Sequence, residues 1–83
     1  MSNLAAVPSM SSAKTEQIRI VVNGQERAAP GGLNITGLLD YLGIEADRVA
    51  VELDRAIVPK QAWAGTQVPD GANLEIVQFV GGG

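Results

Sequence analysis

The most reactive feature that the sequence offers is its end, where Gly81, Gly82 and Gly83 follow an apolar stretch. Three residues span at most about 10 Å, and glycines without side chains can thread a narrow channel in another protein. Such a tail could place the Gly83 carboxylate in a partner's active site. A carboxylate is a poor electrophile, but adenylation by ATP makes it a mixed anhydride that a persulfide can attack, which yields a thiocarboxylate. An inert, flexible tail is the alternative interpretation.

Residue types that the chain lacks narrow the chemistry further. The sequence contains no Cys and no His, which removes thiolate nucleophiles, imidazole bases, disulfides and the usual zinc ligands. Ser-His-Asp and Cys-His catalysis are excluded because their base is missing. We therefore predict that the protein is not an enzyme, uses no cofactor or metal, and enters chemistry as a substrate or carrier.

Length and charge indicate one small soluble domain. A chain of 83 residues buries only about 60% of the surface that its unfolded form exposes, which leaves little room for an enclosed active site. The net charge of −3 and six scattered Lys and Arg residues argue against a nucleic-acid partner. No apolar run approaches the roughly 20 residues of a membrane span, and Pro8 interrupts the apolar start too early for a secretory signal. The expected location is the cytoplasm.

The sequence divides into three parts, one of which must carry the tail. Residues 1–16 are rich in Ser and Ala and lack periodicity, so they are predicted to form a flexible N-terminal extension. Residues 17–80 hold the strand and helix patterns of a single domain, without internal repeats. Residues 81–83 are the predicted flexible tail.

Alternation of side chains and β-branched residues predict the strands of this domain. In chain order the predicted strands are residues 17–22, 25–29, 49–53, 57–58 and 74–80. Asn23-Gly24 between the first two is a strong signal for a tight hairpin. Pro59 stops the fourth strand, and residues 68–71 form a turn before the last one.

One main helix is predicted between the hairpin and the later strands. Asn34 is a good N-cap for a helix that begins at Ile35, and Gly43 stands where a left-handed residue commonly ends a helix. Four apolar residues at helical spacing share one face of this helix: Ile35, Leu38, Leu39 and Leu42.

The order of the elements predicts an α+β fold. We write this order as ββαββ, with a short helical turn over residues 60–64 before the last strand. It is typical of the β-grasp, or ubiquitin-like, fold, in which one main helix covers a mixed sheet and the first and last strands are parallel neighbours at its centre. The strand–helix–strand order also predicts a right-handed crossover that brings residues 49–53 beside a parallel neighbour.

Two apolar side chains near the tail are candidates for partner docking. If Leu74 and Ile76 face the helix, Val77 and Phe79 face the other side of the sheet. Exposed apolar residues beside the tail would form a docking patch. The alternative is that a loop or the N-terminal extension covers them.

Three other conspicuous residues receive mainly structural interpretations. Trp63 is the single Trp, and we predict that it packs the short helical turn against the sheet. Glu52 and Asp54 are predicted to be solvated charges at a sheet edge. Docking of these two acids to a basic partner surface is the alternative.

From Ile18 to Gly83 the chain resembles the ThiS family, the sulfur carriers of thiamine thiazole synthesis. The resemblance rests on these stretches: Val22-Asn23-Gly24, Leu38-Leu39-Asp40-Tyr41-Leu42, Val49-Ala50-Val51-Glu52-Leu53-Asp54, Ile57-Val58-Pro59-Lys60-Gln61-Ala62-Trp63, Asp70-Gly71 and Glu75 to Gly83. The Ile-Val-Pro-Lys segment followed by Trp63, together with the Gly-Gly end, is its most specific part. Two departures are Asp54, where the family often has Asn, and Ala72, where many members have Asp.

The resemblance implies a set of partners. In that family an E1-like adenylyltransferase (ThiF-like) would adenylate Gly83, and a cysteine desulfurase would supply sulfur through a persulfide. The resulting thiocarboxylate would donate its sulfur to a thiazole synthase (ThiG-like). The carrier would be a recycled co-substrate.

Three other functions remain open from the sequence. The small subunit of molybdopterin synthase (MoaD-like) shares the fold, the tail and the chemistry. A ubiquitin-like modifier would be joined through Gly83 to lysines of target proteins. A simple binding module with an inert tail is the third.

Overall fold

The computed structural model describes residues 16–79 of the chain. The predictions for residues 1–15 and for Gly81, Gly82 and Gly83 therefore lie outside the described residues. Glu16, which we assigned to the N-terminal extension, already contacts the domain, because its carbonyl oxygen accepts a hydrogen bond from the Gly31 N–H at 2.9 Å.

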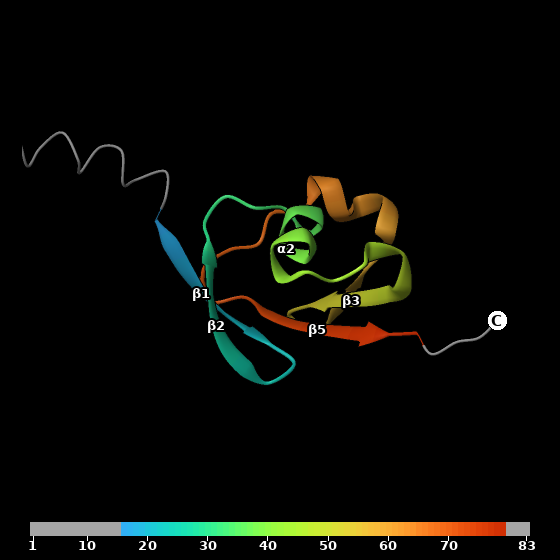
Figure 1. Cartoon of the computed structure of the whole chain (residues 1–83), viewed down its shortest axis with the longest axis horizontal. Coiled ribbons are helices and arrows are strands. Elements are labelled where there is room, and N and C mark those ends of the chain that lie inside the picture. Colours follow the sequence, from blue (N-terminus) through green and yellow to red (C-terminus); the bar gives the residue numbers. More distant parts are fainter. Residues whose placement is uncertain (1–15, 80–83) are drawn as a thin grey trace, which may run out of the picture.

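Five strands form one mixed sheet in the order β2-β1-β5-β3-β4. Their bounds are β1 (Gln17–Val22), β2 (Gln25–Pro30), β3 (Val49–Leu53), β4 (Ala56–Val58) and β5 (Asn73–Gln78). β1 and β5 are parallel, and the other neighbouring pairs are antiparallel. The helix α2 (Ile35–Leu42) lies across one face of this sheet (Figure 1). The predicted β-grasp arrangement, with the first and last strands parallel at the centre, is confirmed.

The structure corrects two details of the predicted topology. The short segment Ala56–Val58 pairs with β3 as an edge strand, so the order ββαββ becomes ββαβββ. The parallel neighbour predicted for residues 49–53 is wrong, because β3 pairs antiparallel with both β4 and β5. The crossover through α2 joins β2 to β3, and both β1 and β5 lie between these two strands in the sheet.

Local turn and cap signals act as the sequence predicts. Asn23 (φ 51°) and Gly24 (φ 83°) both adopt positive φ, as a type I′ hairpin turn requires. The side chain of Asn34 accepts a hydrogen bond from Gly37 N–H at 2.7 Å. Gly43 ends α2 in the left-handed conformation at φ 76°.

The core lies between α2 and the sheet. Its buried apolar side chains come from all the longer elements: Ile20, Val22, Ala29, Ile35, Leu38, Leu39, Val49, Val51, Trp63, Val68, Ala72, Leu74 and Ile76. Trp63 belongs to the 3₁₀ helix η2 (Lys60–Gly65), and its indole N–H donates to the Val58 carbonyl at 2.8 Å. The predicted structural role of Trp63 is thereby confirmed.

A second 3₁₀ helix, η1 (Ala46–Arg48), leads directly into β3. In residues 16–79, no helix is both long enough and apolar enough to span a membrane.

Candidate functional site

The central strand β5 carries the chain toward its C-terminal glycines. The backbone N–H of Phe79 donates to the Arg48 carbonyl at 2.7 Å, so pairing with the β3 side continues one residue past the end of β5. Gly81, Gly82 and Gly83 lie outside the described residues, and their roles stay predictions. The sheet therefore fixes the backbone position up to Phe79, the last residue that the structure describes before the glycines (Figure 1).

The hairpin turn between β1 and β2 supports β5 through a contact that the sequence did not reveal. Asn23 accepts a hydrogen bond from the Ile76 N–H at 2.7 Å and donates from its amide nitrogen to the Ile76 carbonyl at 3.1 Å. Its side chain thus pairs with both the backbone N–H and the backbone carbonyl of Ile76, a residue 53 positions away. We infer that Asn23 both shapes the turn and anchors the strand that leads to the tail.

The face of β5 opposite α2 carries exposed apolar side chains. Val77 is 58% exposed and Phe79 57% exposed, whereas Leu74 and Ile76 are buried against the helix side. Side chains alternate across a strand, so the predicted orientation of both pairs agrees with the structure. Partner docking by Val77 and Phe79 stays a proposal.

The strand register extends this surface beyond the two predicted residues. Ala50 of β3 lies opposite Val77 of β5, and Ile57 of β4 lies in the neighbouring cross-strand row. Ile57 is 72% exposed, more than any other large apolar side chain among the described residues. We call the surface formed by Ala50, Ile57, Val77 and Phe79 the open-face patch.

Sequence reasoning missed Ile57 because two adjacent apolar residues do not show which one faces the core. Val58 pairs with the buried Val51 and is half-buried itself, so the neighbouring Ile57 points to the opposite face. Only the pairing of β4 with β3 shows which of the two residues faces the core. The alternation of the short run before Pro59 was the only available signal.

A groove of about 260 Å³ lies next to the open-face patch. Phe79 and Ile57 line it together with residues of η1, β3 and η2, among them Val49 and Trp63. Lys60 and Asp47 also line the groove and form an ion pair. The hydrogen bond from Lys60 and its positive charge lower the pKa of Asp47, so this carboxylate is ionised at neutral pH.

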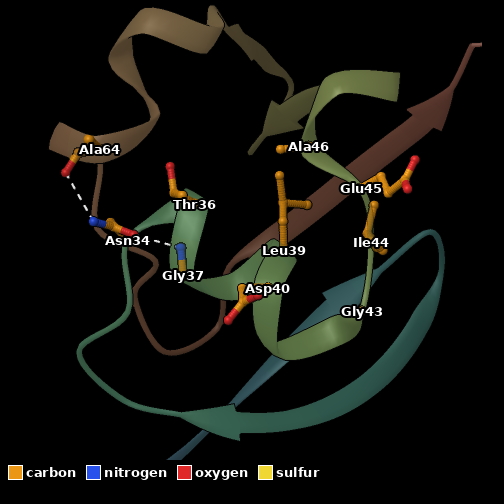
Figure 2. A pocket seen from close by; sticks show the side chains of 10 residues that line it. All are labelled: Asn34, Thr36, Gly37, Leu39, Asp40, Gly43, Ile44, Glu45, Ala46 and Ala64. Carbon is orange, nitrogen blue, oxygen red and sulfur yellow. Dashed lines mark hydrogen bonds between the residues drawn. The ribbon is translucent and has the colours of Figure 1, made fainter.

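A second, larger hollow of about 740 Å³ lies beside α2 (Figure 2). Figure 2 shows Asn34 between Gly37 and Ala64, and its amide nitrogen donates to the Ala64 carbonyl at 3.2 Å. The side chain of Asn34 thus holds the start of α2 to η2. Asp40 and Glu45 also line the hollow, and Glu45 lies on the side away from Ala64 (Figure 2).

The two acidic residues considered in the sequence differ in their surroundings. Asp54 is exposed, as predicted for a solvated charge, and its carboxylate also accepts the Asn73 N–H at 2.9 Å. It therefore holds the turn after β3 to the start of β5. Glu52 lies on β3, which is inside the sheet, and the prediction of an edge position is wrong for this residue.

Comparison with protein families matches residues 18–83 to the ThiS family. The match covers every described strand except the first residue of β1, and it extends through the C-terminal glycines. Sequence and fold thus point to the same family.

Individual relatives give a consistent result. The sulfur carrier protein ThiS of Escherichia coli is 29% identical over 66 residues, covering 80% of this chain and all of that protein. The crystal structure of a thiamine biosynthesis protein (ThiS) from Geobacter metallireducens superposes with a TM-score of 0.70 at 36% identity, covering 80% of this chain and 100% of that one.

A longer relative is also similar. A thiazole synthase of Paramagnetospirillum magneticum is 44% identical over 66 residues, which are 80% of this chain and 20% of that protein. A second thiazole synthase, from Magnetococcus marinus, is 33% identical over the same share of its length. The chain thus spans only a fifth of the length of these two relatives.

Proposed function

This chain belongs to the ThiS family, and from that membership we propose that it is a sulfur carrier of thiamine biosynthesis, a co-substrate and not an enzyme. The family match carries the proposal because it runs to residue 83 and so includes the last glycine. The structure supports it through a central strand that leads to the tail with an exposed apolar surface beside it.

The proposed chemistry takes place on the carboxylate of Gly83. One carboxylate oxygen attacks the α-phosphorus of ATP, pyrophosphate leaves, and an acyl-adenylate forms. A persulfide sulfur then attacks the acyl carbon and AMP leaves, which gives an acyl disulfide. A second thiol cleaves the sulfur–sulfur bond and is oxidised to a disulfide, and the carrier is released as a thiocarboxylate. The chain has no Cys, so both thiols belong to other proteins.

The proposed partners follow from this sequence of steps. An E1-like adenylyltransferase (ThiF-like) activates the tail, and a cysteine desulfurase is the source of the persulfide. A thiazole synthase (ThiG-like) accepts the sulfur. The two thiazole synthases that contain a segment similar to this chain support the last partner, since a carrier joined to its acceptor would act on it directly. We place these reactions in the cytoplasm.

The mass of the intact protein tests the chemistry. Protein isolated from cells that make thiamine should carry a form heavier by about 16 Da, because sulfur replaces one oxygen of the terminal carboxylate. Treatment with iodoacetamide should alkylate this form alone, since the chain has no Cys. Heavier ladders of conjugates would identify a protein modifier instead, and an unchanged mass would indicate an inert tail.

Replacing Phe79 with Ala should weaken binding to the adenylating enzyme by about 1–3 kcal/mol, as loss of an aromatic anchor does at interfaces. Three glycines lose much conformational entropy when they are ordered, so the folded domain must supply binding energy of its own. Phe79 is 57% exposed, and the melting temperature should therefore change little. Titration calorimetry and thermal unfolding measure the two quantities on one variant.

Tyr41→Ala is the matched control for Phe79→Ala. Tyr41 is an aromatic residue of similar exposure, 51%, but it lies on α2. Its replacement should leave the affinity unchanged. A Phe79→Ala variant that is strongly destabilised, yet binds normally at temperatures where it is folded, would contradict docking through Phe79.

A further inference from the structure

Two glutamates face each other on the open side of the sheet. The register pairs Glu52 of β3 with Glu75 of β5, and it pairs Glu52 with Ile57 of β4 on its other side. Glu52 and Glu75 alternate with the buried Val51 and Ile76, so both carboxylates lie on the face that carries the open-face patch. Directly opposed residues on one face have Cβ atoms about 5 Å apart.

This arrangement is unfavourable for the isolated sheet. Like charges directly opposite each other destabilise a sheet. Within residues 16–79 the ion pairs involve other acids, and neither Glu52 nor Glu75 takes part in one. Arg19, which lies on the same side of the sheet, is paired with Glu26 at 3.7 Å.

We propose that the Glu52–Glu75 pair binds a lysine or arginine side chain of the adenylating enzyme that receives the tail. The inference rests on the proposed function and adds to it the chemistry by which the partner is recognised. A cation between the two carboxylates offsets their mutual repulsion. The complex therefore contains favourable ion pairs at a position where the free domain has only repulsion. A guanidinium fits this position well because it donates several hydrogen bonds in a fixed plane.

The position of the pair relative to the tail identifies the occupant. Glu75 precedes Phe79 by four residues, about 13 Å along a strand. Residues 80–83 extend at most about another 14 Å. An interface of about 800 Å² on each partner is roughly 30 Å across, so an enzyme whose contact surface runs from Gly83 back along β5 over Phe79 and Val77 reaches Glu75.

The surrounding patch makes the interaction more effective. Ile57 is 72% exposed and lies beside Glu52 on β4, and Val77 is 58% exposed and lies two residues after Glu75 on β5. Apolar contacts around a polar contact exclude water from it, and a charge pair is stronger where water is excluded. The net charge of −3 also attracts a basic surface from a distance.

The double variant Glu52→Gln/Glu75→Gln tests the proposal. It should melt at a higher temperature than the natural chain, because the repulsion between the carboxylates is gone. Its association rate with the ThiF-like enzyme of the same organism should fall about tenfold at low ionic strength, with a weaker salt dependence. In ATP–pyrophosphate exchange KM should rise while kcat stays unchanged, because the tail is intact. Stopped-flow mixing and exchange assays measure these effects.

Two further variants sharpen the result. Asp40→Asn removes one charge on α2 and should leave the association rate and the KM of exchange unchanged. This control separates local recognition from the effect of net charge. Glu75→Lys can pair with Glu52 across the strands, so it should fold stably and bind more weakly than the double Gln variant.

The outcomes separate the inference from the proposed function. Absence of exchange with the natural chain would contradict adenylation of the tail. Exchange with the natural chain, together with unchanged association of a stabilised double variant, would overturn the recognition role. The pair would then serve only to keep the apolar face from self-association.

Discussion

Deletion of Gly82 and Gly83 is expected to abolish ATP-dependent activation and to leave the fold unchanged. Truncation moves the terminal carboxylate back by up to about 7 Å, so it no longer reaches the α-phosphate in the partner's site. The domain itself should be unaffected, because the core is formed by residues between Ile20 and Ile76. ATP–pyrophosphate exchange with the ThiF-like enzyme measures the first effect, and thermal unfolding measures the second.

A chain that begins at Glu16 is the control for this truncation. It lacks 15 residues but keeps Gly83, so its exchange activity should equal that of the full chain. The truncated tail should also still bind the enzyme, though more weakly, because Val77 and Phe79 remain. An acyl-adenylate on the chain that lacks both glycines would show that the proposed site is wrong.

Leu39→Ala should destabilise the domain by about 2–5 kcal/mol, the usual cost of removing a large side chain from a core. Leu39 is 1% exposed and faces the sheet from α2. A domain of this size has a total stability at the lower end of about 5–15 kcal/mol. The variant should therefore be partly unfolded near physiological temperature. Urea denaturation gives the free energy of unfolding of both forms.

The adjacent helix residues supply matched controls for Leu39→Ala. Tyr41→Ala on the exposed side of α2 should cost less than 1 kcal/mol, as surface changes away from special features do. Leu42→Ala should give an intermediate loss, because Leu42 is half-buried at the edge of the core. A transition midpoint near that of the natural chain for Leu39→Ala would show that this position is not part of the core.

The described structure separates two sides of the molecule. α2 and its core contacts supply the stability, and the opposite side of the sheet offers the open-face patch and the acidic pair. A small carrier benefits from this division, because a partner can cover one face without disturbing the packing on the other. Variants on the two sides should accordingly affect affinity and stability independently.

Several features of the fold follow from the sequence alone because their causes are local. Asn23-Gly24 adopts the two positive φ angles of a hairpin turn. Asn34 caps the start of α2 and Gly43 caps its end, both as predicted. Each of these depends on backbone preferences and hydrogen bonds within a few positions. The chemical hypothesis for Gly83 is equally a matter of sequence, since it depends on residue types at the chain end and on a family resemblance.

Tertiary structure alone decides which strands become neighbours and which residues meet. Alternation shows that Glu52 and Glu75 each lie on one face of a strand, but only the antiparallel pairing of β3 with β5 places them opposite each other. The pairing of β4 with β3 exposes Ile57, and the contact of Asn23 with Ile76 joins residues 53 positions apart. Register depends on packing between segments distant in the chain, and a shift of one residue turns every side chain to the other face. Local periodicity is the same for both registers, so the open-face patch forms only when the sheet is assembled.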